Sequence, residues 1–533
     1  MGTAQETKDY FRYCPGEAQI KISNAICRGR RQAHFPRCPG CQFNDDEKSG
    51  AAAPQSACVD RPSGEIESMF RSCDIVGAVP SPLSEDVAWR IGHATGQFLH
   101  GRLRGLDRAD PNIRTMIVGR DMRPHSKLLS DALADGIRST GLDVTDIGEV
   151  DVALVYYVVH QFGACGGVMV TGGPYAADRG GFKICGTRAL PIGTATGLAS
   201  IRDIAGRVPR HRSGATSKVT RRDMTRVYRQ FIRRFTHTPR PAEKPVSLVA
   251  DAMGGVAGRW IPRLFAARCG MDIHPLHFEP NCLGRTRPDP ASPRQQTVLR
   301  RAVRARRASF GIGFDGDADR CTILDERGGL VPPDRVAALL ARRFIEREPG
   351  AAIVFDLRFS NAAFEEVLRA GGSVFRERVG SAHIKKTMTD RHAVFGADLD
   401  GRYFYRDNAF SESAMLTMVH VANLLRETGR TLSDLVRPLN RYRTSDEVRL
   451  PSDDADRAIR RLVSAHQGAE IEEIDGVTVR YDDWWLHARP DDVGNLSVVV
   501  EARTRKLVDQ HLADLEHFLT GIDAPQDAPV GAA

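Results

Sequence analysis

Short apolar runs and amphipathic stretches alternate along most of the chain. Met116-Ile-Val118 has the length and composition of a strand, and residues 153–162 have the periodicity of a helix. Cys165 to Thr171 is a longer apolar run of the kind found in buried strands, and Val246 to Ala250 is another. Strands that alternate with helices in this way predict α/β domains built on mixed or parallel sheets.

One loop between two apolar runs is rich in acidic residues. Residues 313–320 read Gly-Phe-Asp-Gly-Asp-Ala-Asp-Arg, so that Asp315, Asp317 and Asp319 alternate with small residues and Arg320 follows them. Hard divalent cations such as Mg²⁺ prefer carboxylate oxygens, and acids this close repel one another unless a cation lies among them. The pattern therefore predicts a metal site. The alternative is an exposed Asp-rich turn; an EF-hand is not indicated, because the loop lacks the closing glutamate.

The length and charge of the chain limit the kinds of protein it can be. Its 533 residues indicate three or four domains with ample core, and its formal net charge is +8. Basic residues concentrate in residues 221–234 and 299–307, which we predict to be helices. Nucleic-acid binding is one explanation, but no nucleic-acid fold motif is present. We favour solvated basic helix faces, which would attract phosphate-bearing small molecules.

Targeting and redox signals are few. No apolar run approaches the roughly 18 residues of a membrane span, and the N-terminus lacks the basic and apolar regions of a secretory signal. The eleven cysteines are an odd number and several lie in predicted strands, which favours reduced thiols over a disulfide framework. We therefore expect a cytoplasmic protein with no membrane partner.

The N-terminal residues 1–65 differ in composition from the rest. Cys38-Pro-Gly-Cys41 is a CxxC pair, and Cys14 and Cys27 precede it. A Pro-Gly turn lets two thiolates face one ion, so that these four cysteines are candidate Zn²⁺ ligands in a small module through which a protein partner could bind. Unliganded cysteines in an extension and a redox pair are the alternatives.

The order of these segments resembles the α-D-phosphohexomutase family, the phosphomannomutases and phosphoglucomutases, from about Phe70 to about Ala502. The resemblance implies an α/β protein with a four-domain architecture, three similar α/β domains and a C-terminal α+β domain. Here these would follow an N-terminal Cys-rich extension. The expected segments are the extension at 1–65, the three α/β domains at 66–215, 216–328 and 329–432, the C-terminal domain at 433–522, and a disordered tail at 523–533.

The resemblance also implies a chemistry. In that family a phosphoserine exchanges its phosphoryl group with a hexose phosphate, and magnesium is held by three aspartates that match Asp315, Asp317 and Asp319. Catalytic roles are implied for three basic residues by the motifs around them: Lys183 in Gly181-Phe-Lys-Ile184, Arg120 in Val118-Gly-Arg-Asp121, and Arg320 after the aspartates.

The nucleophile of the family is not matched. Counting back from Lys183, Gly173 occupies the serine position and Pro174 the adjacent histidine position. Thr171 and Tyr175 carry the nearest hydroxyl groups, and neither stands at the matching position. Glycine has no side chain to phosphorylate, so that phosphoryl transfer through this position is expected to be lost or altered.

Two further loops depart from the family pattern. In the sugar loop, Asp398, Asp400 and Arg402 stand where the family has Glu, Ser and His, and they are the expected sugar-binding residues. In the phosphate loop Arg489 is retained, but Asp491 and Asp492 place carboxylates where a phosphate dianion would bind. A fourth loop carries Ser381 where the family has a histidine.

Three functions are consistent with this pattern. The first is a mutase-fold protein that binds Mg²⁺ and a hexose phosphate or related carbohydrate after losing phosphoryl transfer, and we favour it. The second is an active isomerase, an intramolecular phosphotransferase that uses a sugar bisphosphate as donor. The third is an enzyme of changed chemistry on another carbohydrate ligand.

Overall fold

The computed structural model describes residues 11–13, 21–23, 64–103, 111–210, 217–238, 243–265, 269–281, 284, 286–452, 454–491 and 494–520. The chain forms two compact units, Met1–Arg61 and Pro62–Ala533. In the first unit, β1 (Phe11–Tyr13) pairs antiparallel with β2 (Lys21–Ser23). The four candidate zinc ligands, Cys14, Cys27, Cys38 and Cys41, lie outside the described residues, as does the tail at 523–533.

The first sheet of the second unit is mixed and has the order β3-β7-β6-β4-β5-β8. Strands β6, β4, β5 and β8 run parallel, whereas β7 is antiparallel to both of its neighbours. The strands are Asp74–Ala78 (β3), Thr115–Arg120 (β4), Asp143–Glu149 (β5), Gly166–Val170 (β6), Arg179–Gly186 (β7) and Val219–Arg221 (β8). Every residue of β6 is buried, as expected from its uninterrupted apolar run.

The second and third sheets share one topology. In the orders β10-β9-β11-β12-β13 and β15-β14-β16-β17-β18, three parallel strands are followed by two antiparallel ones. The second sheet comprises Val246–Asp251 (β9), Met271–Leu276 (β10), Phe310–Phe314 (β11), Cys321–Asp325 (β12) and Leu330–Val331 (β13). The third comprises Ala352–Asp356 (β14), Ser373–Glu377 (β15), Phe395–Ala397 (β16), Tyr403–Tyr405 (β17) and Ser411–Glu412 (β18).

The last sheet is antiparallel throughout. Its order is β19-β24-β23-β22-β21, and β20 also pairs with β24. The strands are Arg443–Thr444 (β19), Val448–Leu450 (β20), Glu470–Glu472 (β21), Val477–Arg480 (β22), Trp484–Pro490 (β23) and Leu496–Ala502 (β24). Three α/β sheets and a C-terminal antiparallel sheet thus agree with the expected fold class.

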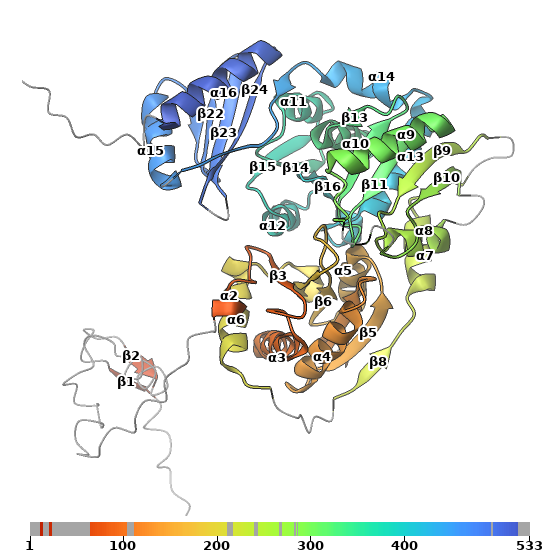
Figure 1. The fold of residues 1–533 in the computed structure, drawn as a ribbon, viewed down its shortest axis with the longest axis vertical. Helices are drawn as coiled ribbons and strands as arrows, with labels where there is room; N and C mark the ends of the chain where they lie inside the picture. The colour runs from red at the N-terminus through yellow and green to blue at the C-terminus, as the bar shows by residue number, and fades with distance from the viewer. Residues whose placement is uncertain are drawn as a thin grey trace, which may run out of the picture. The chain divides into compact units, whose positions relative to one another are not determined.

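Helices pack on these sheets (Figure 1). With the first sheet are α2 (Gly64–Glu67), α3 (Glu85–Arg102), α4 (Ser126–Arg138), α5 (Val152–Gln161) and α6 (Leu198–Arg207). After β8, α7 (Thr225–Arg233) lies beside the first helix of the second sheet (Figure 1). The next two sheets have α8 (Ala257–Leu264), α9 (Pro293–Arg306), α10 (Pro333–Arg347), α11 (Asn361–Arg369), α12 (Ser381–Arg391), α13 (Ala414–Thr428) and α14 (Leu432–Val436). The last sheet has α15 (Ala455–Ala465) and α16 (Arg505–Thr520).

The described residues also form five short 3₁₀ turns. They are Pro111–Arg114 before β4, then Thr187–Ala189, Thr194–Thr196, Arg406–Asn408 and Arg437–Leu439. Among the helices of the described residues, none combines the length and the apolar character that a membrane span requires.

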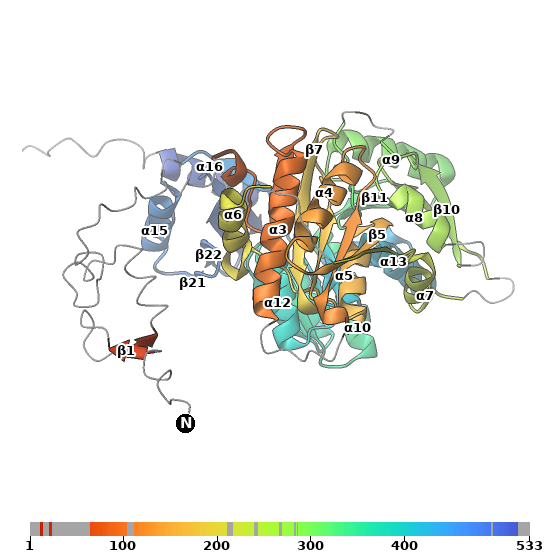
Figure 2. The same cartoon turned by 90° about the horizontal axis from the view of Figure 1, so that it is seen from below.

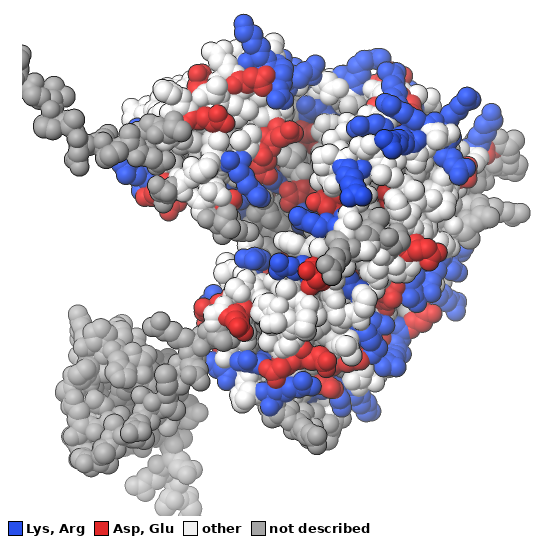
Figure 3. Space-filling view, viewed as in Figure 1, with Lys and Arg blue, Asp and Glu red and all other residues white. Residues whose placement is uncertain are grey.

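The basic stretch predicted as one helix over 221–234 is only partly helical. Arg221 is the last residue of β8, which pairs with β5, and α7 begins at Thr225. The pairing of β8 with the sheet edge takes precedence over the local helical pattern. On the face drawn in Figure 3, Lys and Arg side chains are interspersed with Asp and Glu.

The second and third sheets share one hydrophobic cluster, whereas the last sheet has a separate one. One hydrophobic cluster extends from α5 through the second and third sheets and includes Val155, Phe314 and Phe355. The last sheet has its own cluster, which includes Leu462 and Val498. The metal-loop and sugar-loop sheets are therefore packed into one continuous apolar interior, which fixes the loops at their edges.

Candidate active site

The acidic loop connects β11 to β12 and folds tightly on itself. The backbone N–H of Asp315 donates to the carbonyl of Arg320 (3.3 Å), and Asp315 Oδ1 accepts hydrogen bonds from the N–H groups of Asp319 (3.1 Å) and Arg320 (3.2 Å). Ala318 adopts a φ of +58°, a left-handed conformation that reverses the chain. As a result one ligand atom from each of the three aspartates lies within 4.8 Å of the others, and all three side chains are buried.

The donor set of this loop fits a divalent cation. Asp315 Oδ2 and Asp317 Oδ1 are buried and accept no hydrogen bond from the described residues. Burial, the largest cause, and repulsion between the acids raise the pKa of Asp315. Burial would also raise the pKa of Asp319, but Lys183, Arg402 and Arg320 outweigh it and lower that pKa. A cation among the three would let all of them ionise, and carboxylate oxygens are what Mg²⁺ prefers.

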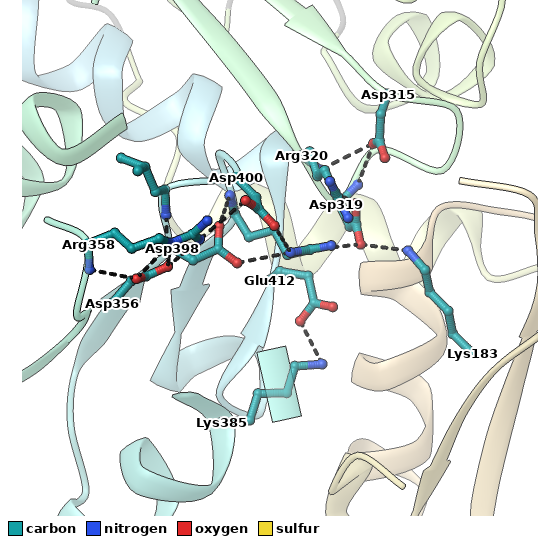
Figure 4. Close-up of polar contacts among 12 residues, drawn as sticks. Lys183, Asp315, Asp319, Arg320, Asp356, Arg358, Lys385, Asp398, Asp400 and Glu412 are labelled. Carbon is teal, nitrogen blue, oxygen red and sulfur yellow. Dashed lines mark hydrogen bonds and ion pairs between the residues drawn. The ribbon is translucent and has the colours of Figure 1, made fainter. Parts of the chain in front are cut away.

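Lys183 reaches this loop from β7 of the first sheet. Its Nζ lies 2.7 Å from Asp317 Oδ2 and 2.6 Å from Asp319 Oδ2. Burial opposes the charged ammonium, but Asp317 and Asp319 outweigh burial and raise the pKa of Lys183. Lys183 is therefore a fixed positive charge beside the aspartates (Figure 4).

Gly173, in the loop between β6 and β7, faces the same aspartates. Its φ is +49°, and a Cβ atom at this position would lie 3.9 Å from Asp317 Oδ1 and 4.0 Å from Lys183 Nζ. No other heavy atom of the described residues is closer apart from chain neighbours. The position that the family resemblance gives to the serine thus points at the acidic loop.

A buried pair, Asp121 and Arg123, that the sequence motifs do not indicate shapes this loop. Arg123 Nη2 donates to the carbonyls of Gly173 (3.0 Å) and Tyr175 (2.7 Å). Asp121 accepts from the Gly172 N–H (3.1 Å) and pairs with Arg123. The available signal was Asp121-Met-Arg123 directly after an apolar strand, where polar residues at a sheet edge often serve a site.

The sugar-loop residues lie between β16 and β17 and are joined by one arginine. Arg402 Nη1 contacts Asp398 Oδ2 (3.0 Å) and Asp400 Oδ2 (3.2 Å), and Arg402 Nε lies 3.5 Å from Asp319 Oδ2. Burial raises the pKa of Asp398 to about 6, although Arg402 opposes the shift. For Asp400 the nearby Arg358, Arg320 and Arg402 outweigh burial and lower the pKa. Arg402 therefore connects the sugar loop to the metal loop.

Arg358 and Glu447 extend the charged network and were not predicted from the sequence. Arg358 Nη2 contacts Asp400 Oδ1 (3.3 Å), and Arg358 Nη1 donates to Glu447 Oε2 (2.9 Å). Glu447 Oε1 in turn lies 3.5 Å from Arg489 Nη2. The sequence signal for Arg358 was its place directly after strand β14, whereas Glu447 is unremarkable in sequence.

A second buried pair lies beside Arg402. Lys385 of α12 contacts Glu412 at 2.6 Å, and both side chains are buried (Figure 4). The Lys385 ammonium also lies 3.8 Å from the ring centroid of Tyr156 on α5. This contact joins the third sheet to the first through a cation–π interaction.

Other expected site residues have different surroundings. Arg120, at the end of β4, pairs with Asp146 at 3.5 Å, and no contact with the aspartates of the acidic loop is described for it. Arg320 Nε lies 3.8 Å from Asp319 Oδ1, and its backbone forms an isolated bridge with Arg402. Asp491 closes its own loop by accepting from the Asn495 N–H (2.9 Å), and Asp492 lies outside the described residues.

Comparison with known proteins gives the family. Models of phosphoglucomutase/phosphomannomutase alpha/beta/alpha domains I, II and III match residues 67–209, 226–329 and 332–442. A protein of Xanthomonas campestris pv. campestris described as phosphohexose mutases is 30% identical over 459 residues, covering 85% of this chain and 99% of that protein. A phosphomannomutase of Escherichia coli K12 is 30% identical over 462 residues, covering 82% and 98%.

A solved structure agrees with this assignment. The crystal structure of a phosphoglucomutase/phosphomannomutase family protein from Burkholderia thailandensis matches with a TM-score of 0.75 at 26% identity, covering 85% of this chain and 97% of that one. The domain matches, the sequence relatives and this structure lead to one conclusion: the chain belongs to the phosphoglucomutase/phosphomannomutase family.

Proposed function

We propose that this protein binds Mg²⁺ and a hexose phosphate in the cleft of the family but does not transfer the phosphoryl group through a serine. The observation that carries the proposal is the direction of Gly173, whose missing Cβ would point at Asp317 and Lys183. The position is oriented as a nucleophile should be, and the residue there has no oxygen to offer. Under this proposal the cleft is retained and the covalent intermediate is not.

Asp315, Asp317 and Asp319 would hold the magnesium ion, which supplies charge neutralisation for a bound phosphate when present. Lys183 would add a second positive charge at the same place. The two unsatisfied buried oxygens of Asp315 and Asp317 support this assignment, because buried carboxylate oxygens without partners are costly.

The sugar and the distal phosphate would be bound by the remaining loops. Asp398 and Asp400 would accept hydrogen bonds from sugar hydroxyl groups, with Arg402 holding both carboxylates in place. Arg489, which contacts Glu447, would present its guanidinium group to the distal phosphate, and the buried Arg358 would hold Asp400 and Glu447 in place. Catalytic roles for Arg120 and Arg320 remain predictions from the resemblance.

The proposal is tested with the full-length protein. Thermal unfolding is followed with MgCl₂, with glucose 1,6-bisphosphate and with both, and mutase activity is measured on glucose 1-phosphate and mannose 1-phosphate with the bisphosphate present. We expect both ligands to raise the melting temperature and the mutase assay to show no product. Asp317→Asn should remove the magnesium effect.

Two further measurements distinguish a protein without a nucleophile from an active mutase. Turnover by the wild type at rates of about 1 s⁻¹ or more, typical of enzymes, would instead make it an active mutase that uses the bisphosphate as direct donor. A double variant, G173S with P174H, restores the family residues at the loop, and mutase activity gained by it would support a sound cleft with a deleted nucleophile.

A further inference from the structure

The Cα of Gly173 faces polar atoms of the acidic loop and of Lys183. The three heavy atoms nearest to a Cβ atom there, chain neighbours apart, are Asp317 Oδ1 (3.9 Å), Asp317 Oδ2 (4.0 Å) and Lys183 Nζ (4.0 Å), all at ordinary van der Waals distance. The space that a serine hydroxymethyl group would fill is therefore open to another small group. An oxygen placed further along the same direction comes within hydrogen-bonding reach of these atoms.

The atoms around this space suit a water molecule. Asp317 is fully buried, and its Oδ1 accepts no hydrogen bond from the described residues. Because a carboxylate has about four lone-pair sites, Asp317 can accept from a water molecule and still bind a cation. Lys183 Nζ carries three N–H donors and lies against the same carboxylate. A buried water needs two to four polar partners, and Asp317 Oδ1 and Lys183 Nζ supply two of them beside this position.

The hydroxyl group of Thr171 is engaged elsewhere, and Tyr175 is partly exposed. Thr171 Oγ1 donates to Asp121 Oδ2 (3.0 Å) and accepts from the Gly173 N–H (2.9 Å). The Tyr175 side chain is 39% exposed, and the Arg287 guanidinium lies 5.5 Å from its ring centroid. Neither hydroxyl therefore replaces the missing serine oxygen at this place.

We propose that water occupies the place of the serine oxygen and that the protein hydrolyses hexose phosphates. The proposal rests on the proposed function, because the reacting phosphate must lie where the cleft would hold it. In phosphoryl transfer the protein mainly positions the nucleophile and neutralises charge, so that replacing an alkoxide-forming serine by water changes the acceptor but not the geometry of the transfer.

The step is balanced without any further reactant. The water oxygen forms a bond to phosphorus as the bond from phosphorus to the sugar oxygen breaks. One proton of the water passes to the sugar oxygen, and the other stays on the phosphate. The products are the sugar with a free hydroxyl group and hydrogen phosphate, and the Lys183 ammonium faces the non-bridging phosphate oxygens during the step.

The test follows inorganic phosphate released from glucose 1-phosphate, mannose 1-phosphate and glucose 1,6-bisphosphate in ¹⁸O-labelled water. We expect the wild type to release phosphate that carries one ¹⁸O atom from the solvent. Gly173→Ala, whose methyl group would fill the space, should lower the rate at least tenfold. The same variant should still show the melting-temperature rise that inorganic phosphate with MgCl₂ gives to the wild type.

Gly148→Ala is the matched control, because Gly148 also has a positive φ (+81°) and a Cβ there would meet nothing within 4 Å. The Gly148→Ala variant carries similar backbone strain but adds no atom to the site. It should hydrolyse hexose phosphates as fast as the wild type does. Gly173→Ser should exchange hydrolysis for mutase activity.

Three outcomes would overturn the inference. In the first, glucose 1,6-bisphosphate stabilises the wild type but no phosphate is released. In the second, ¹⁸O is found in the sugar rather than in the phosphate. In the third, the G173A variant releases phosphate as fast as the wild type. The first leaves the proposed function intact. Absence of any ligand-induced stabilisation would instead refute the proposed function itself, so that the two failures are distinguishable.

Discussion

At the scale of single residues, burial changes the ionisation of carboxyl groups that have no cation beside them. Asp151 precedes α5 and is fully buried. Its Oδ1 accepts from the Leu154 N–H (2.8 Å) and its Oδ2 from the Tyr228 hydroxyl (2.6 Å). Burial is the largest cause and raises its pKa to about 7, although the two hydrogen bonds oppose the shift.

This pKa shift predicts a loss of stability as pH rises. Below the unfolded pKa of about 4 the group is protonated in both states and contributes no pH dependence. Between about 4 and 7 the unfolded chain releases the proton that the native state keeps, so that the free energy of unfolding falls. From pH 5 to pH 8 the free energy of unfolding of the wild type should therefore fall by about 2 kcal/mol relative to that of Asp151→Asn. Denaturant unfolding at each pH measures this difference.

Asp454→Asn provides the control, because Asp454 also caps a helix, α15, but is exposed. The stability difference between this variant and the wild type should change far less over the same pH range. An Asp151→Asn variant whose stability followed that of the wild type from pH 5 to pH 8 would contradict the prediction.

At the scale of elements, two helices of the first sheet pack at unusually short range. Figures 1 and 2 show α3 beside α4. A Cβ added at Gly92 of α3 would lie 2.2 Å from the Leu133 carbonyl oxygen of α4, and one added at Gly136 of α4 would lie 2.0 Å from the Trp89 carbonyl oxygen of α3. The two glycines thus let the helix backbones approach each other.

Gly92→Ala should destabilise the first sheet by about 1–3 kcal/mol, because the obstructing atom is a backbone carbonyl that cannot move without displacing α4. Thermal unfolding or denaturant titration measures the change. Gly101→Ala, also in α3 but exposed with nothing within 4 Å, should instead stabilise by about 0.5–1 kcal/mol through helix propensity. Equal effects at both positions would show that close packing is not what requires Gly92.

At the scale of the whole molecule, alternating charges connect all four sheets of the second unit. The series runs Lys183, Asp319, Arg402, Asp400, Arg358, Glu447, Arg489. Its last link across sheets, Arg358 to Glu447, joins the third sheet to the last one, which has its own hydrophobic cluster. Two backbone N–H groups next to the third sheet donate to side chains beside or within the last sheet: Asn361, the first residue of α11, to Glu501 (2.9 Å), and Val379, after β15, to Asp475 (3.0 Å).

Glu447→Gln should let the last sheet separate more readily, because it removes the charge that pairs with the buried Arg358. We expect the amides of Asn361 and Val379 to exchange with solvent about tenfold faster, as for the loss of one charge-assisted hydrogen bond. Hydrogen exchange of peptides that contain Asn361 and Val379 measures these rates. Glu348→Gln breaks an exposed pair with Arg406 within the third α/β segment and should leave both amides unchanged.

Much of the metal loop and of the fold could be predicted from sequence because the signals are local. Asp315, Asp317 and Asp319 are near neighbours in the chain, and alternation with small residues between two apolar strands suffices to bring them together. Apolar runs likewise fix β6 and β14, since a buried strand requires them. The start of α7 was misjudged because strand pairing depends on a distant partner.

The sequence by itself determined which chemical groups the cleft has, including the absence of an oxygen at Gly173, because side-chain identity needs no fold. Only the tertiary structure decided that Gly173 faces Asp317 and Lys183, that Arg402 joins two loops, and that Arg358 and Glu447 take part. These contacts link residues far apart in the chain, and their distances follow from how sheets pack together. Burial, which sets the charge on Asp151 and Asp398, is likewise a property of the packed molecule.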